Sequence, residues 1–71
     1  MSADNYLQVT RHEPGVWFKD SPAWVLSEGR MSCYPNHQEV LLVSRTEAQV
    51  DAYLNGLDRI GYCTEYGVLH T

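Results

Sequence analysis

The chain has little positive charge. A single lysine, Lys19, and four scattered arginines stand against nine acidic residues, which gives a formal net charge of -4. Direct binding to nucleic acid is therefore not expected, because proteins that bind phosphates normally present a cluster of basic side chains. The acidic balance permits binding to a basic protein surface instead, although it is also what keeps many small proteins soluble.

Cysteines and long apolar runs are scarce as well. Cys33 and Cys63 are the only cysteines, which are too few for a disulfide scaffold, and we expect free thiols. No apolar run approaches the length of a membrane span, and residues 1–5 lack the charged and apolar regions of a signal peptide. The sequence therefore predicts a cytoplasmic protein without a membrane partner.

Catalytic motifs are missing. The five glycines are dispersed, so there is no phosphate-binding loop and no dinucleotide fingerprint. His12 and Glu13 are adjacent, and sequence neighbours on a strand point to opposite faces, so they do not form a catalytic pair. We expect no enzymatic activity and no cofactor.

Four side chains have the chemistry of zinc ligands, namely Cys33, His37, Cys63 and His70. Their spacing matches no recognised zinc-finger pattern, and His70 is the penultimate residue, where chains are often disordered. We therefore predict that no metal is bound. A Cys/His metal or redox protein remains the second alternative function.

A helix is predicted over residues 46–60, because apolar side chains recur there with a period of about 3.6 residues. Thr46 and Gln49 have the spacing of a reciprocal capping box, and Gly61 suits the end of the helix. Residues 39–43 precede the helix with a continuous apolar run and are predicted to form the most buried strand. The predicted buried stripe of the helix is Val50, Tyr53, Leu54, Leu57 and Ile60.

Alternating polarity predicts a strand at residues 6–12, and Pro14-Gly15 predicts a turn that returns into a strand at residues 16–19. Residues 23–26 suit either a third strand, which we favour, or a single helical turn. The strand reading places a hairpin tip at Glu28-Gly29. Further strands are expected at residues 30–34 and at residues 62–69, the last with a bend at Gly67.

These elements predict a single α+β domain over residues 1–71, frayed at residues 1–4. The expected architecture is a small, mostly antiparallel four- to five-stranded sheet with one α-helix packed on one face, in the order ββ(β)ββαβ. One helix covers only one sheet face, yet aromatic residues make up 11% of the chain. Some aromatic side chains should therefore remain exposed, as in protein-binding patches.

Two surfaces suit recognition. An acidic line should run along the outer face of the helix, although an ordinary solvated face would have the same composition. Exposed aromatics on the uncovered sheet face form the second surface, and Tyr66 is a further candidate for exposure. The predicted partner-binding residues are Tyr6, Trp17, Trp24, Tyr34, Glu47, Asp51, Asn55 and Asp58.

The leading functional prediction is a small acidic protein-interaction module that binds and occludes a partner protein, for which a basic nucleic-acid-binding protein is one candidate. In size, acidity and lack of catalytic residues the chain resembles phage-encoded inhibitors such as anti-CRISPR proteins, some of which mimic nucleic acid in charge. This resemblance is one of type, without a shared motif. The first alternative is a structural or homo-oligomerising subunit that pairs with a copy of itself.

Overall fold

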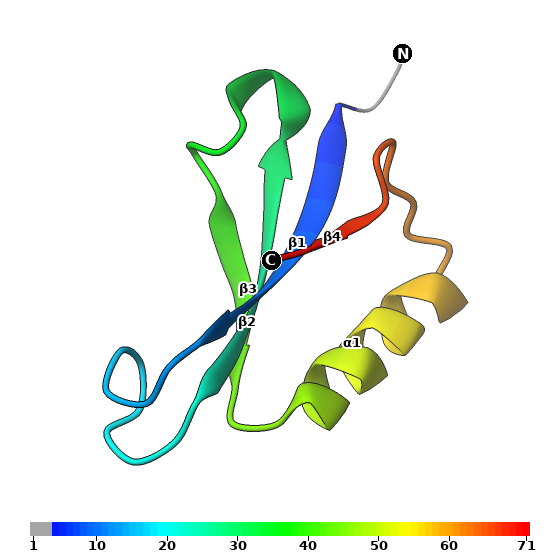
Figure 1. The fold of residues 1–71 in the computed structure, drawn as a ribbon. Helices are drawn as coiled ribbons and strands as arrows, with labels where there is room; N and C mark the ends of the chain where they lie inside the picture. Colours follow the sequence, from blue (N-terminus) through cyan, green and yellow to red (C-terminus); the bar gives the residue numbers. More distant parts are fainter. Residues whose placement is uncertain (1–3) are drawn as a thin grey trace.

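A computed structural model describes residues 4–71 as a four-stranded sheet with a single α-helix packed on one face (Figure 1). The predicted α+β class is confirmed. Among residues 4–71, no helix is both long enough and apolar enough to cross a lipid bilayer. Along the chain the elements are β1 (Asn5–His12), β2 (Ala23–Arg30), the 3-10 helix η1 (Met31–Cys33), β3 (Glu39–Ser44), α1 (Glu47–Arg59) and β4 (Val68–His70).

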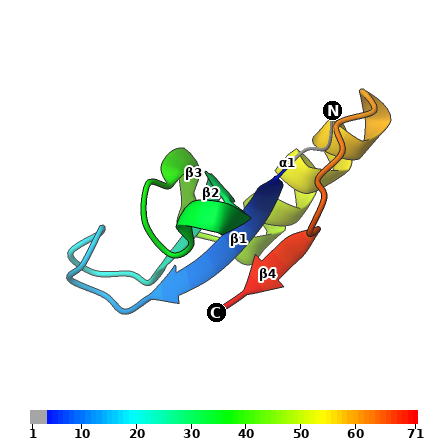
Figure 2. The same cartoon turned by 90° about the horizontal axis from the view of Figure 1, so that it is seen from above.

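The sheet has the strand order β3-β2-β1-β4 and is mixed rather than antiparallel throughout. β1 and β3 each run antiparallel to β2, whereas β4 runs parallel to β1. Parallel strands need a long crossover connection, and α1 supplies it. The helix carries the chain from the β3 edge to the β4 edge across the face that it covers (Figure 2).

The core lies between this covered face and α1. Leu7 and Val9 of β1, Leu26 of β2 and Val50 of α1 are buried together there. Alternate residues of a strand point to the same face, which is why the alternation in residues 6–12 correctly predicts β1.

The predicted buried stripe of α1 is only partly correct. Val50 is buried, and Leu54 and Leu57 pack against the core, but Tyr53 and Ile60 are exposed. Ile60 is the C-cap residue of α1, and this end of the helix extends past the sheet in Figure 1.

The first hairpin differs from the prediction, because residues 16–19 do not form the returning strand. β1 pairs along its whole length with β2, and residues 13–22 form the loop between them. The favoured strand at residues 23–26 is confirmed. It continues through Gly29, so the predicted hairpin tip at Glu28-Gly29 is wrong.

Two further predicted strands are wrong or shortened. Residues 31–33 form η1 instead of a strand, and residues 62–66 form a loop before β4. β4 begins only where it meets the free edge of β1, at the bond from the Leu7 N–H to the Gly67 carbonyl oxygen (3.0 Å).

β3 is an edge strand and not the most buried one. Glu39 and Val40 are exposed, whereas Leu41, Leu42 and Val43 are half-buried. A continuous apolar run is typical of a strand covered on both faces, but β3 has a strand neighbour on one side only.

The predicted capping box is absent. Thr46 occupies the N-cap of α1 but makes no side-chain capping bond. Its backbone N–H donates to Ser44 Oγ at 3.0 Å, and the Ser44 hydroxyl also contacts the Gln49 side chain. Ser44, at the end of β3, takes the place that the sequence pattern assigns to Thr46.

Asp4 is held in place and is not frayed. Its carbonyl oxygen accepts a hydrogen bond from the Met31 N–H at 2.8 Å, and its carboxylate accepts one from the Ser32 N–H at 3.1 Å. These bonds tie the start of β1 to η1. The rest of the predicted frayed segment, residues 1–3, lies outside the described residues.

Candidate functional site

The loop between β1 and β2, residues 13–22, projects from one end of the sheet (Figure 1). Its tip carries Val16 and Trp17, which are 63% and 47% exposed. Trp17 thus lies in a loop and not on the uncovered sheet face, where the sequence places it. Clustered apolar residues that stay exposed in a folded domain are typical of interaction sites.

Arg45 holds the base of this loop. Its guanidinium carbon lies 4.1 Å from the centroid of the Phe18 ring. Its Nη1 is 3.2 Å from Asp20 Oδ1 and 3.1 Å from Ser21 Oγ. An exposed cation–π contact contributes about 0.5–1 kcal/mol. A loop that is ordered before binding loses less conformational entropy when a partner is bound.

Contacts within the loop hold its tip. The Gly15 N–H donates to the Phe18 carbonyl oxygen at 2.6 Å, which closes a tight turn around the tip. The Trp17 ring makes an edge-to-face contact with His12, with the ring centroids 6.2 Å apart. One side of the indole is therefore supported by the end of β1, while the rest of its surface remains accessible.

α1 carries the predicted acidic line, which we call the acidic helix face, but Glu47 and Asp58 lie at the flank of the helix beside core residues and not on the side that faces away from the sheet. Glu47, Asp51, Asn55 and Asp58 are all exposed. Among residues 4–71, none of these carboxylates takes part in an ion pair. Their negative charge is therefore available to attract a basic surface.

Arg45 also connects the two surfaces. Its side chain contacts the loop, while its backbone lies in the short connection between β3 and Glu47, the first residue of α1. The base of the loop and the first turn of α1 are consequently neighbours, and one partner can contact both.

Tyr6 is fully buried, so the predicted contact between Tyr6 and a partner is corrected. Its ring lies over Gly29, and its hydroxyl oxygen accepts a hydrogen bond from Gln38 Nε2 at 2.9 Å. The ring of Tyr34 meets it edge-on, with centroids 5.4 Å apart. Residues 31–38 thus fold back over part of the sheet face that α1 leaves open.

Trp24 and Tyr34 lie apart from Trp17. Trp24 is half-buried on the covered face, where it packs against the core cluster. Tyr34 is exposed but lies with Tyr6 at the start of β1, at the opposite end of the sheet from the loop. The predicted partner-binding residues thus do not form one patch: Tyr6 and Tyr34 lie together at one end of the sheet, Trp24 lies beside Glu47 of α1, and Trp17 lies on the loop.

Sequence reasoning missed Val16 as part of the exposed tip, and it missed Phe18 and Arg45 as the pair that braces the loop. A usable signal was present at both ends of residues 13–22, where Pro14-Gly15 and Ser21-Pro22 are typical of loops. No local signal links Arg45 to Phe18, because the contact depends on the strand order.

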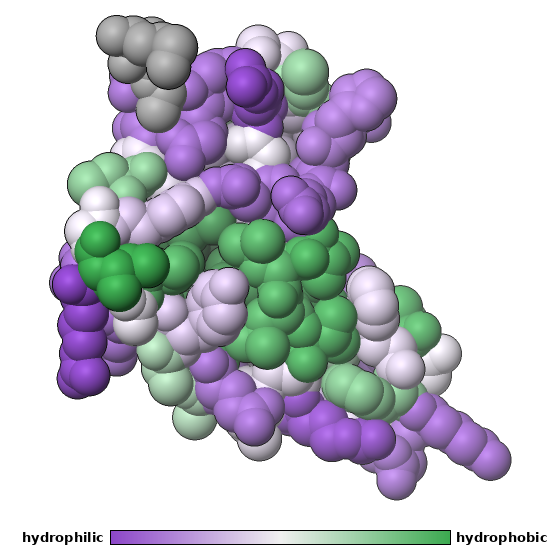
Figure 3. All heavy atoms as spheres, turned by 180° about the vertical axis from the view of Figure 1, so that it is seen from behind, coloured by the Kyte–Doolittle hydropathy of each residue, from purple (hydrophilic) through white to green (hydrophobic). Residues whose placement is uncertain are grey.

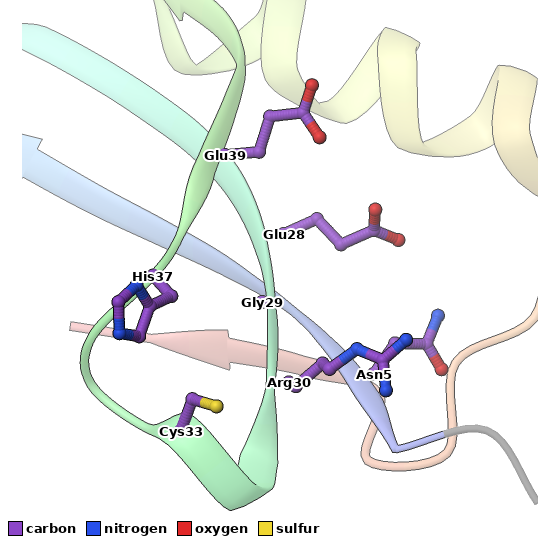
Figure 4. Close-up of a pocket in the computed structure, with 7 residues that line it drawn as sticks. All are labelled: Asn5, Glu28, Gly29, Arg30, Cys33, His37 and Glu39. Carbon is purple, nitrogen blue, oxygen red and sulfur yellow. The ribbon is translucent and has the colours of Figure 1, made fainter.

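A separate shallow pocket of about 400 Å³ lies where β2 leads into η1 (Figure 4). The carboxylates of Glu28 and Glu39 point away from Cys33 and His37, so acid and thiol do not converge on one point. Within residues 4–71, no group of three or more His, Cys, Asp or Glu side chains is placed to hold a metal ion. The residues that line the pocket are Asn5, Glu28, Gly29, Arg30, Cys33, His37 and Glu39.

The loop tip and the acidic helix face are the two adjoining surfaces that the structure presents for recognition. Their side chains are exposed, and neither set belongs to the core. A function has to be inferred from their geometry and chemistry. No known protein family, curated protein sequence or solved structure gives a significant match to this chain.

Proposed function

We propose that this protein is a small interaction module that binds a partner protein and occludes the surface that it contacts. The observation that carries the proposal is the exposed pair Val16 and Trp17 at the tip of a loop that Arg45 braces. Tryptophan is enriched among interface hot spots, where one side chain contributes about 2 kcal/mol or more.

The partner should offer a hollow for the indole of Trp17 next to a basic area. The acidic helix face adjoins the loop and would lie against that basic area. Complementary charge of this kind mainly raises the association rate and selects the partner. Proteins that bind nucleic acid carry such basic surfaces, which makes them the partner class that fits best.

Occlusion follows from what the two surfaces contain. An apolar loop tip and a row of carboxylates can recognise a surface, but they do not supply a nucleophile paired with a base. The effect on the partner is therefore to cover the surface that it needs for another ligand. The free thiols of Cys33 and Cys63 suit a reducing cytoplasm as the place where this happens.

The test compares three immobilised chains: the wild type, Trp17→Ala and Tyr66→Ala. Tyr66 is a matched control, because it is 48% exposed but lies in the loop before β4. Each chain is used to capture proteins from cell extract, and binding kinetics are then measured with the purified protein that the wild type captures. Circular dichroism verifies that all three chains are folded.

We expect Trp17→Ala to weaken binding by about 30-fold or more, mainly through faster dissociation, and Tyr66→Ala to change it by less than about 2-fold. Unchanged binding by a folded Trp17→Ala chain would refute the role of the loop. Equal losses in both variants would show that the partner does not select this end of the molecule.

A further inference from the structure

β3 forms a free edge of the sheet. It stands first in the order β3-β2-β1-β4, and its strand neighbour is β2. In the part of the chain that the structure describes, no backbone hydrogen bond outside the β2 ladder involves residues 39–44. The outward N–H and C=O groups of such an edge are a template for pairing with another strand.

Apolar side chains follow one another along this edge, from Val40 to Val43, and Val40 is 48% exposed. Figure 3, the view from behind, shows apolar side chains gathered in the middle of this side, with polar residues above and below them. Proteins usually protect a free edge with charged residues, above all lysine, or with proline. Residues 40–43 contain none of these.

A β-bulge in β3 gives the side chains along this edge a symmetric order of faces. The pairing of β3 with β2 shifts by one residue at Leu41, and both Leu41 and Leu42 pack against the core on the covered face. Val40 and Val43 flank them and pair with β2 residues that point to the open face. From Val40 to Val43 the side chains therefore point to the open, covered, covered and open faces of the sheet. This order is the same when the strand is followed in the opposite direction.

We propose that two copies of this chain form a dimer in which their β3 strands pair antiparallel. A two-fold axis perpendicular to the sheet relates the two copies. Residues directly opposite each other in an antiparallel pair have side chains on the same face. Val40 of one copy then meets Val43 of the other on the open face, and Leu41 meets Leu42 on the covered face. Without the bulge, residues 40 and 43 would point to opposite faces and this register would be impossible.

Charge favours a second copy in this orientation. Glu39 begins β3, and Arg45 follows its last residue, Ser44. Antiparallel pairing places Glu39 of each copy opposite Ser44 of the other and next to Arg45. A parallel arrangement would bring the two copies of Glu39 together, beside the Glu28 that pairs with each. Like charges in such positions are destabilising.

The interface of this dimer is small. A six-residue strand such as β3 spans about 20 Å. A standard interface buries about 800 Å² on each partner, roughly a sixth of the 4903 Å² that one copy exposes. One strand edge and its neighbouring side chains bury less than that, so we expect dissociation in the micromolar range.

Pairing would join two surfaces that a single copy keeps apart. Within one copy, Tyr34 and Trp17 lie at opposite ends of the sheet, beside Tyr6 and His12 of β1. In the antiparallel dimer, the Tyr34 end of one copy lies beside the Trp17 loop of the other. This consequence rests on the proposed function, whereas the dimer itself does not.

Sedimentation equilibrium of the full chain, from low micromolar to near millimolar concentration, tests the dimer. Val40→Lys places an ammonium group in the interface and should raise the dimer dissociation constant by about 30-fold or more. Val68→Lys is the matched control, because Val68 is a 37% exposed valine on β4, the opposite edge strand. Val68→Lys and Trp17→Ala should leave the constant unchanged, and the latter separates the dimer from the proposed function.

A second measurement needs no substitution and holds even if Val40→Lys fails to fold. In a mixture of isotope-labelled and unlabelled wild-type chains, nuclear Overhauser effects should connect the methyl groups of Val40 and Val43 of different copies. A wild-type chain that stays monomeric, or a dimer that Val68→Lys breaks and Val40→Lys does not, would overturn the proposal. So would a monomer whose capture of another protein depends on Val40, because a foreign strand would then occupy the edge.

Discussion

The Tyr6 ring lies over Gly29, its partner in the β1–β2 ladder, so closely that a Cβ added at Gly29 would be 2.6 Å from the Tyr6 hydroxyl oxygen. Only glycine leaves room for the ring. Because Gln38 donates a hydrogen bond to the same oxygen, this pair also anchors the segment that leads from η1 into β3. A glycine inside a strand marks a close approach here and not a turn.

Gly29→Ala should therefore destabilise the domain by about 1–3 kcal/mol, as overpacking in a buried site does. Gly56→Ala is the control, because Gly56 lies inside α1 with nothing within 4 Å of an added Cβ. That substitution should stabilise the domain by up to about 1 kcal/mol. Urea denaturation of the two variants and the wild type measures both effects. Equal stability of the Gly29→Ala chain would mean that Tyr6 can move aside freely.

The sequence predicts those parts of the fold that depend on local pattern. The period of apolar residues locates α1, alternation locates β1, and a continuous apolar run locates β3, because these signals come from residues close in the chain. The order of the strands does not follow from such signals. The apolar run of β3 looks the same for a central strand and for an edge strand, and Gly29 is typical of a hairpin tip unless the neighbour Tyr6 is known.

The candidate site divides in the same way. The acidic helix face follows from helical spacing, and its residues are exposed as predicted, but Glu47 and Asp58 lie at the flank of the helix and not on its outer face. The exposure of Trp17 depends on which segment pairs with β1, and the sequence assigned that pairing to residues 16–19. Tyr6 is buried because residues 31–38 fold over the open sheet face, which no periodicity in the chain indicates.

Leucine truncations should separate the true core of the domain from the partly covered stripe. Leu26 is fully buried, so Leu26→Ala should lower the free energy of unfolding by about 2–5 kcal/mol. Leu54 is half-buried, and Leu54→Ala should cost less than Leu26→Ala. Ile60→Ala should change stability by less than about 0.5 kcal/mol, since Ile60 is exposed. Chemical denaturation gives all three values. A larger loss of stability for Ile60→Ala than for Leu54→Ala would show that the face of α1 assigned to the core is wrong.

The acidic helix face should act on the rate of association. Replacing Asp51 and Asp58 by Asn removes two charges and keeps the shape of the side chains, so we expect slower association with the partner at low salt and little change in dissociation. The difference from the wild type should shrink as salt screens the charges. Surface plasmon resonance at several salt concentrations measures this. Glu65→Gln, on the loop before β4, removes one charge away from α1 and is the control for net charge, and half or more of the effect there would remove the assignment to α1.

Asp4 should show an acid-sensitive contact. Hydrogen bonds from the Ser32 hydroxyl and the Ser32 N–H hold the pKa of Asp4 below its ordinary value of 3.8, with a smaller contribution from Arg30. A carboxyl group with a lowered pKa in the folded state stabilises that state above its unfolded pKa, and the effect is lost as pH falls through the folded pKa. The contact with η1 should therefore persist at neutral pH and be released only in acid below about pH 3.8. An NMR titration of the Asp4 carboxyl group should show this, and Ser32→Ala should raise its pKa toward the ordinary value. An unchanged pKa in that variant would rule out the Ser32 hydroxyl as the cause and leave the Ser32 N–H.

Arg45 should control the order of the loop between β1 and β2 without controlling the stability of the fold. Its side chain is 57% exposed, and ion pairs in such positions contribute about 1 kcal/mol or less. Arg45→Ala should therefore leave the unfolding free energy nearly unchanged, while NMR order parameters of residues 16–18 fall from about 0.85 toward 0.6. Arg45→Lys should recover little of this order, because an ammonium group lacks the planar stacking of a guanidinium on Phe18.

Arg59→Ala is the control for this change. Arg59 lies exposed in the last turn of α1, at the opposite end of the helix from Arg45, and forms no ion pair within residues 4–71. Arg59→Ala should therefore leave the loop as ordered as it is in the wild type. If Arg45→Ala loosens the loop, the variant should bind the partner more weakly although Trp17 is intact. Binding would then cost the conformational entropy of ordering the indole. A loop that stays rigid without Arg45 would show that Gly15 and His12 suffice to hold the tip.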